Sequence, residues 1–286
     1  MPEARAAHAG PLLDVAGLHV RFATPRGLVH AVRGIGFTMG REKLGIVGES
    51  GSGKSVTARA ILGLVPRPGR VEAERIDFGG TDLRGLSPRQ WRAVRGRRIA
   101  MVLQDPKFSL NPVMPVGEQI AEAYRTHAKA SRAEARDRAL AMLEAVRIRD
   151  PRRVYGAYPH EVSGGMGQRI MIAMMLVPEP ELLIADEITS ALDVTVQMQV
   201  LAILDDLVTQ RGMGLIFISH DLSLVASFCD RVQIMYAGRI VEEARASALS
   251  AARHPYTRGL LACLPSVDEA ERAELPVLKR DPAWLA

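Results

Sequence analysis

The 286-residue sequence is poor in cysteine and in aromatic residues, and it has no long uninterrupted apolar run. Its two cysteines, Cys229 and Cys263, are too few for a disulfide framework, so they fit a reducing compartment. The most apolar stretch, residues 170–185, is interrupted by two prolines and two glutamates, which predicts that no segment spans a bilayer. The N-terminal MPEARAAHAGP lacks the apolar core of a signal peptide, so we expect an unexported, cytoplasmic chain.

The net charge of +5 would suit nucleic acid or an anionic membrane surface. Six arginines lie close together in the sequence, at positions 84, 89, 92, 95, 97 and 98. Trp91 is the only aromatic residue among them, so a stacking platform for single strands is poorly supported. We therefore expect a solvated or interface-facing helix and no nucleic-acid partner.

A glycine-rich stretch, GESGSGKS at residues 48–55, directly follows the apolar run Leu44 to Val47. Glycine lets backbone N–H groups turn inward without a Cβ, and the helix that follows directs its positive end toward the same point. Lys54 adds a charge for the outer phosphates and Ser55 a hydroxyl for Mg2+. The pattern predicts ATP-type nucleotide binding by Gly48, Ser50, Gly51, Gly53, Lys54, Ser55 and Val56. An apolar face at 56, 60, 61 and 64 predicts the helix, which should end before Pro66.

Four short apolar runs are typical of buried parallel strands, at residues 44–47, 99–103, 182–185 and 215–218. Each run ends on a polar residue or a glycine. These endings are Gly48, Gln104, Asp186 with Glu187, and Ser219 with His220. Because α/β folds bind ligands at the carboxyl edge of such a sheet, the pattern predicts an α/β nucleotide-binding core with these residues along that edge.

The polar strand ends suggest catalytic roles around a nucleotide. Asp186 is placed to hold Mg2+, while Glu187 can orient a water for attack on the γ-phosphate. The Gln104 amide could touch the metal or that water, and His220 could reach the γ-phosphate. A histidine after a strand can also be a helix-capping or core residue, but four such groups on one sheet edge favour a catalytic site.

About eighty residues between the second and third strands differ in character from the core. Ala139, Met142, Leu143 and Val146 have helical spacing, and Ser163 precedes a Met-rich helix that we expect to pack in the core. This region predicts an inserted helical sub-domain. Its SGGMGQ element at 163–168 is either a structural helix cap or a second anion site that meets a nucleotide held by another subunit.

Together these motifs resemble an ABC transporter ATPase over nearly the whole chain. The phosphate loop, Gln104, the SGG element, LLIADE at 182–187, SALD at 190–193 and His220 follow that family's order and spacing. Two further stretches, QDP continuing to SLNP at 104–112 and HPYTRGLL at 254–261, resemble the peptide and nickel importer group. SGGM followed by IMIAMM is similar to the first of the two unlike cassettes that such importers usually carry.

The resemblance implies a fold, a domain plan and a set of partners. The fold would be α/β, a P-loop NTPase core with a mostly parallel sheet, an inserted helical sub-domain and antiparallel β elements near the N-terminus. Residues 11–258 would form the nucleotide-binding domain, with the core at 11–106 and 179–250 and the helical sub-domain at about 107–178. Residues 259–286 would be a C-terminal extension.

In this family two cassettes sandwich two ATP molecules, so Ser163 and Gly165 would face Lys54 and Ser55 of a partner cassette, which is a different chain or a second copy. Phe22 would stack on adenine, although a strand phenylalanine can also simply pack in the core. ATP hydrolysis with Mg2+ would drive uptake of peptides, nickel or a related small solute. The partners would be two membrane permeases and an extracytoplasmic solute-binding protein, with this chain peripheral at the cytoplasmic face of the inner membrane.

The sequence departs from the family pattern at Gly167, where arginine is usual, and at Ile188, where proline is usual. Neither change removes a reacting group, so we expect an active but slow ATPase.

Two other functions remain in view. A ribosome-type ATPase would be expected to show tandem cassettes or a long coiled coil, and an exporter would often carry fused membrane spans. Cys263 alone is too little for an iron–sulfur cluster, and the histidines show no paired metal spacing.

Overall fold

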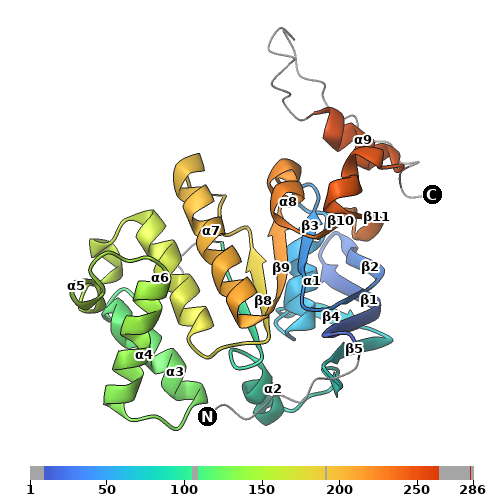
Figure 1. The fold of residues 1–286 in the computed structure, drawn as a ribbon. Helices are drawn as coiled ribbons and strands as arrows, with labels where there is room; N and C mark the ends of the chain where they lie inside the picture. The colour runs from blue at the N-terminus through green and yellow to red at the C-terminus, as the bar shows by residue number, and fades with distance from the viewer. Residues whose placement is uncertain (1–9, 105–108, 191, 264–283, 285–286) are drawn as a thin grey trace, which may run out of the picture. The chain divides into compact units, whose positions relative to one another are not determined.

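The computed structural model describes residues 10–104, 109–190, 192–263 and 284 (Figure 1). The chain forms two compact units, residues 1–85 with 217–286 and residues 86–216. Over the described part, no helix is long and apolar enough to cross a membrane. The division of the chain into a core, a helical sub-domain and a C-terminal extension stays a prediction.

The first unit begins with an antiparallel sheet of five strands in the order β2-β1-β5-β6, with β4 also paired to β1. The strands are β1 Leu13–Thr24, β2 Gly27–Met39, β4 Gly69–Glu72, β5 Arg75–Phe78 and β6 Thr81–Asp82. Along β1 the apolar residues Leu13, Val15, Leu18 and Val20 are buried, because β-bulges shift their spacing so that all reach the core. The expected antiparallel elements near the N-terminus are confirmed.

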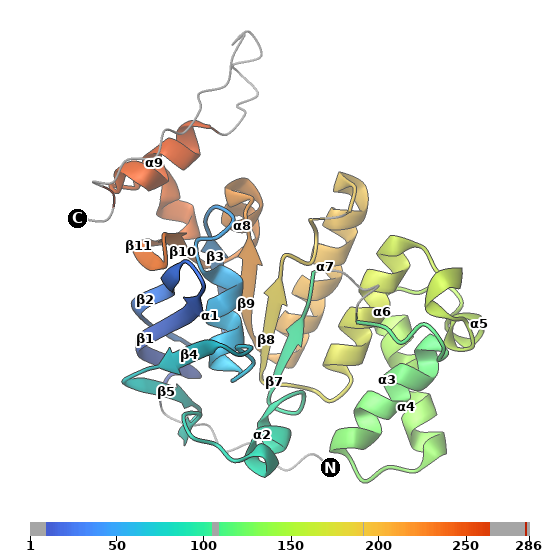
Figure 2. The ribbon, with the colours of Figure 1, turned by 180° about the vertical axis from the view of Figure 1, so that it is seen from behind.

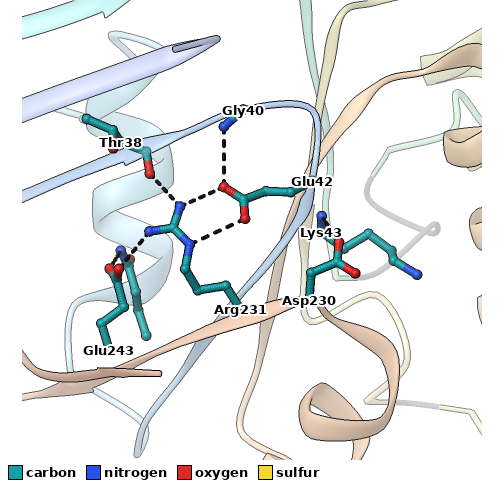
Figure 3. A network of polar contacts seen from close by, with 8 residues as sticks. Thr38, Gly40, Glu42, Lys43, Asp230, Arg231 and Glu243 are labelled. Atoms are coloured by element: carbon teal, nitrogen blue, oxygen red, sulfur yellow. Dashed lines mark hydrogen bonds and ion pairs between the residues drawn. The ribbon is translucent and has the colours of Figure 1, made fainter. Parts of the chain in front are cut away.

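A second group of strands in the first unit carries the phosphate loop. Strand β3 Lys43–Val47 pairs in parallel with β10 Arg231–Tyr236, which pairs antiparallel with β11 Arg239–Arg245. Hydrogen bonds of Arg231 connect these strands. Its guanidinium donates to Glu42 and to Glu243, each at 2.7 Å, and to the Thr38 carbonyl (Figure 3). The start of β3 is therefore fixed a few residues before the loop.

Short helices also occur in the described part of the first unit. They are α1 Lys54–Ile61, α8 Leu222–Phe228, the 3-10 helix η3 Ala246–Ala251 and α9 Pro255–Ala262. Helix α1 buries Ala60 and Ile61 as predicted, but it ends at Ile61. Leu64 follows the helix and is 44% exposed, so its assignment to the helical face was wrong. Periodicity alone did not reveal that the backbone leaves the helix at Gly63, where φ is 60°.

The second unit contains two parallel strands and a set of packed helices. Strand β7 Ile99–Val102 pairs with β8 Leu182–Asp186, and β9 Gly214–Ser219 carries the chain from this unit into the first. The helices are α2 Pro88–Val94, α3 Val116–His127, α4 Arg132–Ala145, α5 Pro151–Tyr155, the 3-10 helix η2 Pro159–Glu161, α6 Gly164–Leu176 and α7 Val194–Arg211. All four predicted strands are confirmed, except that Leu103 lies outside β7 and is 42% exposed.

The helices α3, α4, α5 and α6 gather into one cluster (Figure 2). Ala139, Met142, Leu143 and Val146 are all buried there, and so are Ile170 to Ala173 and Leu176 of α6. The helical spacing of these residues was therefore correctly interpreted as core packing. Helix α2 is different, because both of its arginines, Arg89 and Arg92, are exposed.

Candidate functional site

The phosphate loop occupies residues 48–55 of the first unit, between β3 and α1. Its first glycine is enclosed by the end of β10, because a Cβ on Gly48 would lie 2.1 Å from the Met235 carbonyl oxygen. Gly53 has φ of 103° and lies against the Ala31 carbonyl of β2, where a Cβ would come within 2.5 Å. Gly48 is therefore required by packing alone, and Gly53 by packing and by its left-handed backbone conformation.

Helix α1 begins directly at Lys54, and the N-cap Gly53 provides no side-chain cap. The backbone at the start of α1 is therefore suited to an anion, as the sequence predicted. Lys54 is only 4% exposed, and its ammonium donates to the carbonyls of Gly48 at 2.7 Å and Glu49 at 3.0 Å. Ser50 and Gly51 lie exposed at the tip of the loop, and Ser55 and Val56 are half-buried.

Two other candidates belong to the same unit. Phe22 lies on β1 opposite Val29 of β2 and Gly69 of β4, and its half-buried ring rests against Gly69. That position leaves part of the ring exposed. His220 directly follows β9 and is exposed, while the neighbouring Asp221 caps α8 by accepting the backbone N–H of Leu224. The helix-capping role therefore belongs to Asp221 and not to His220.

The second unit holds the acidic candidates at the end of β8. Asp186 is the last residue of that strand and is 5% exposed. Glu187 begins the following turn with φ of 50°, a left-handed conformation that is strained for a residue with a side chain. Ile188 is 1% exposed, so its side chain is part of the core. Asp186 and Glu187 therefore differ in backbone conformation, although they are adjacent in the sequence.

Gln104 reaches this turn from the strand next to it. Its amide nitrogen donates to the Ser190 hydroxyl at 3.0 Å, and that hydroxyl donates to the Glu187 carbonyl at 3.0 Å. The sequence reasoning did not single out Ser190, although the SALD stretch that contains it was noted. The two bonds bring Gln104 and Glu187 together in this unit. Asp105 and Pro106 lie outside the described residues.

The second glycine-rich element opens α6 in the same unit. Ser163 is its N-cap, and its hydroxyl accepts the backbone N–H of Met166. Gly165 is packed against α7, because a Cβ there would lie 2.6 Å from a methyl group of Val196. The structural-cap interpretation is therefore confirmed, while the contact with a partner's nucleotide stays a prediction. Gly167 is buried within α6.

Comparison with known proteins identifies the family. Residues 32–190 match the family described as ABC transporter. The chain belongs to the ABC transporter family. The solved structures that resemble it include the dimeric cassette MJ0796, with a TM-score of 0.73 at 24% identity over 82% of this chain and 98% of that one. Another is cbiO1 from Clostridium perfringens, with a TM-score of 0.71 at 26% identity over 88% of this chain and 95% of that one.

Sequence relatives of this ABC cassette cover most of its length. A probable peptide ABC transporter ATP-binding protein of Sinorhizobium fredii is 52% identical over 93% of this chain and 80% of its own. The oligopeptide transport ATP-binding protein OppD of Bacillus subtilis is 47% identical over 95% of this chain and 76% of its own. The dipeptide transport protein DppD of Escherichia coli is 46% identical over 93% and 82%. The predicted fold and the ATPase assignment are therefore confirmed.

Proposed function

We propose that this cassette couples ATP hydrolysis to the import of peptides. The observation that carries the proposal is its 46–52% identity to ATP-binding proteins named for peptide, oligopeptide and dipeptide transport. That similarity extends over more than nine-tenths of the chain, so it covers both units. Nickel or another small solute is the second candidate, and it rests only on motifs that the nickel importers share.

The geometry supports a division of roles between the two units. In the first, Lys54 and the backbone of Gly51, Gly53 and Ser55 would bind the phosphates, and Phe22 would contact the adenine through its exposed part. In the second, the Glu187 carboxylate would orient the attacking water, since the Gln104–Ser190–Glu187 hydrogen bonds fix the turn from which it extends. His220, which belongs to the first unit, would donate to the γ-phosphate. Ser163 and Gly165 would contact nucleotide held by a partner cassette.

Mg2+ fits the chemistry of three residues, Ser55, Gln104 and Asp186. Their donors are a hydroxyl, an amide oxygen and a carboxylate, which are the hard oxygen ligands that this ion prefers. Among the described residues no three His, Cys, Asp or Glu side chains gather into a metal cluster. Mg2+ commonly takes one or two carboxylates and completes its shell with phosphate oxygens and waters. The bound ion would neutralise charge on the phosphates.

The proposed assembly rests on the resemblance of the chain to the importer group. Two membrane permeases would carry the cargo, a second cassette would complete the ATP sites, and a solute-binding protein would deliver the peptide outside the membrane. This chain would then lie peripherally at the cytoplasmic face of the inner membrane. If the second cassette is a different chain, the two ATP sites of the assembly differ. If it is another copy of this chain, they are identical.

Uptake by living cells tests this function. Cells whose chromosomal copy carries Glu187→Gln would be compared with the parent strain for uptake of labelled dipeptides, oligopeptides and nickel. Glu144→Gln, which changes an exposed carboxylate of α4 in the same unit, is the matched control. We expect peptide uptake to be lost only in Glu187→Gln. Loss of nickel uptake alone would reassign the cargo, and unchanged uptake with the inactive protein present would refute the peptide import function.

A further inference from the structure

The HPYT stretch at residues 254–257 has a defined place in the first unit. The Glu242 carboxylate of β11 accepts the backbone N–H groups of Arg253 at 2.6 Å and of His254 at 3.3 Å. His254 then caps α9, because its Nδ1 accepts the backbone N–H of Tyr256 at 3.2 Å. Pro255 supplies a backbone already suited to the first helical position. The start of α9 is therefore fixed to the sheet by its own motif.

This arrangement places the Tyr256 side chain against the phosphate loop. The side chain is fully buried, with its ring 4.6 Å from that of Tyr236 and 5.4 Å from that of Trp284. Its hydroxyl accepts the backbone N–H of Glu49, the second residue of the loop, at 3.2 Å. Tyr256 thus connects the C-terminal part of the chain to the nucleotide-binding element some two hundred residues earlier.

A small space adjoins the first half of the loop on the side of Tyr236. A pocket of about 160 Å³ lies between the loop and the turn after β10, and it is lined by Glu49, Ser50, Gly51, Ser52, Tyr236 and Ala237. Hydrogen bonds hold the loop beside this space. Gly238 donates to the Ser52 carbonyl at 2.9 Å, Ser52 donates to the Glu49 carbonyl at 3.1 Å, and Tyr256 accepts from Glu49. The Tyr256 bond is the one of these three that is made by a side chain.

We propose that Tyr256 is a positioning residue for the phosphate loop, and that the HPYT stretch serves to place its hydroxyl there. The inference rests on the proposed assignment of this loop as the ATP site. A loop held in its binding conformation before ATP arrives loses less conformational freedom on binding, so the nucleotide binds more tightly. Tyr256 itself need not touch the nucleotide.

Tyr256→Phe tests the proposal, since it keeps the ring and removes only the hydroxyl. Tyr236→Phe is the matched control, because it removes a hydroxyl from the same ring cluster that makes no hydrogen bond within the described chain. Calorimetric titration of the purified full chain should give a Kd for ATP raised about 3- to 10-fold in Tyr256→Phe, the effect of one lost hydrogen bond, and unchanged in the control. In the assembled transporter, KM for ATP should rise while kcat stays constant. Equal Kd values for both variants would overturn the proposal.

Lys54→Ala distinguishes the two ways in which the inference could fail. If Lys54→Ala binds ATP like the wild type, the loop is not the ATP site and both proposals fall. If Lys54→Ala abolishes binding while Tyr256→Phe matches Tyr236→Phe, only the positioning role is refuted. Should Tyr256→Phe not fold, hydrogen exchange in the wild-type protein decides. Slow exchange of the Glu49 amide without nucleotide supports the bond, and exchange at the rate of an unstructured peptide overturns it.

Discussion

The phosphate loop of the first unit and the Asp186–Ser190 turn of the second are built on different principles. The loop is defined by backbone, because Gly48 and Gly53 lie too close to the carbonyls of Met235 and Ala31 for any side chain. The turn is defined by side chains, since Ser190 links Gln104 to the Glu187 carbonyl. Glu187 in this turn also has a strained φ of 50°, although it is not a glycine.

The difference matches what each region would contribute to catalysis. Binding of phosphates uses main-chain N–H groups, so the loop must keep one backbone path, and its glycines are as much structural as functional. Water activation uses one carboxylate, so the turn can tolerate strain provided that it directs that group. Substitutions in the loop should therefore damage folding and binding together, whereas substitutions in the turn should damage hydrolysis alone.

The largest expected effect is on hydrolysis by Glu187→Gln. This change keeps the size of the side chain but removes the charge that we propose orients the water, so we expect turnover of the assembled transporter to fall about 10²- to 10⁴-fold. ATP affinity should stay within about twofold, because no phosphate contact is lost. Steady-state turnover and equilibrium binding measured on the same preparation check both statements. Undiminished turnover would make His220 the first alternative for positioning the water.

Gly48→Ala tests the other side of the comparison. The added Cβ would lie 2.1 Å from the Met235 carbonyl oxygen, so either β10 or the loop must move. We expect the free energy of unfolding to fall by about 1–3 kcal/mol, as in other overpacked sites, and ATP binding to weaken as well. Gly40→Ala is the control, since nothing lies within 4 Å of its Cβ position. If denaturant titration shows equal stability for both variants, the loop is more adaptable than its packing indicates.

A smaller effect concerns the two departures from the family pattern. Proline at position 188 would restrict the backbone directly after Glu187, and arginine at 167 would remove a glycine from the interior of α6. We expect the double variant Gly167→Arg with Ile188→Pro to raise turnover of the assembled transporter about 2- to 5-fold, a barrier change below about 1 kcal/mol. ATPase rates of wild type and variant decide this. Unchanged turnover would show that neither residue slows hydrolysis.

The sequence predicted β3, β7, β8 and β9 well because each is a short apolar run that ends on a polar residue or a glycine, as β8 does at Asp186. It also predicted the phosphate loop, since the glycine spacing is dictated by a local backbone path. Long-range side-chain bonds escaped it. Nothing near Glu49 indicates that Tyr256 accepts its N–H, and nothing near Gln104 indicates a bond to Ser190. Such pairs depend on how distant segments pack, which periodicity and motif spacing do not encode.

The smallest expected effect is a pH dependence that His127 gives to the second unit. Burial, together with the nearby charge of Arg97, lowers the pKa of this histidine below its ordinary value of 6.5. As the pH falls through 6.5 the unfolded chain binds a proton that the folded chain does not, so stability must decrease in acid. His127→Gln should lose this part of the decrease and should leave stability above neutral pH little changed. Denaturant titrations of both proteins at neutral and mildly acidic pH measure the difference, and parallel losses of stability would mean that His127 is protonated alike in the folded and unfolded states.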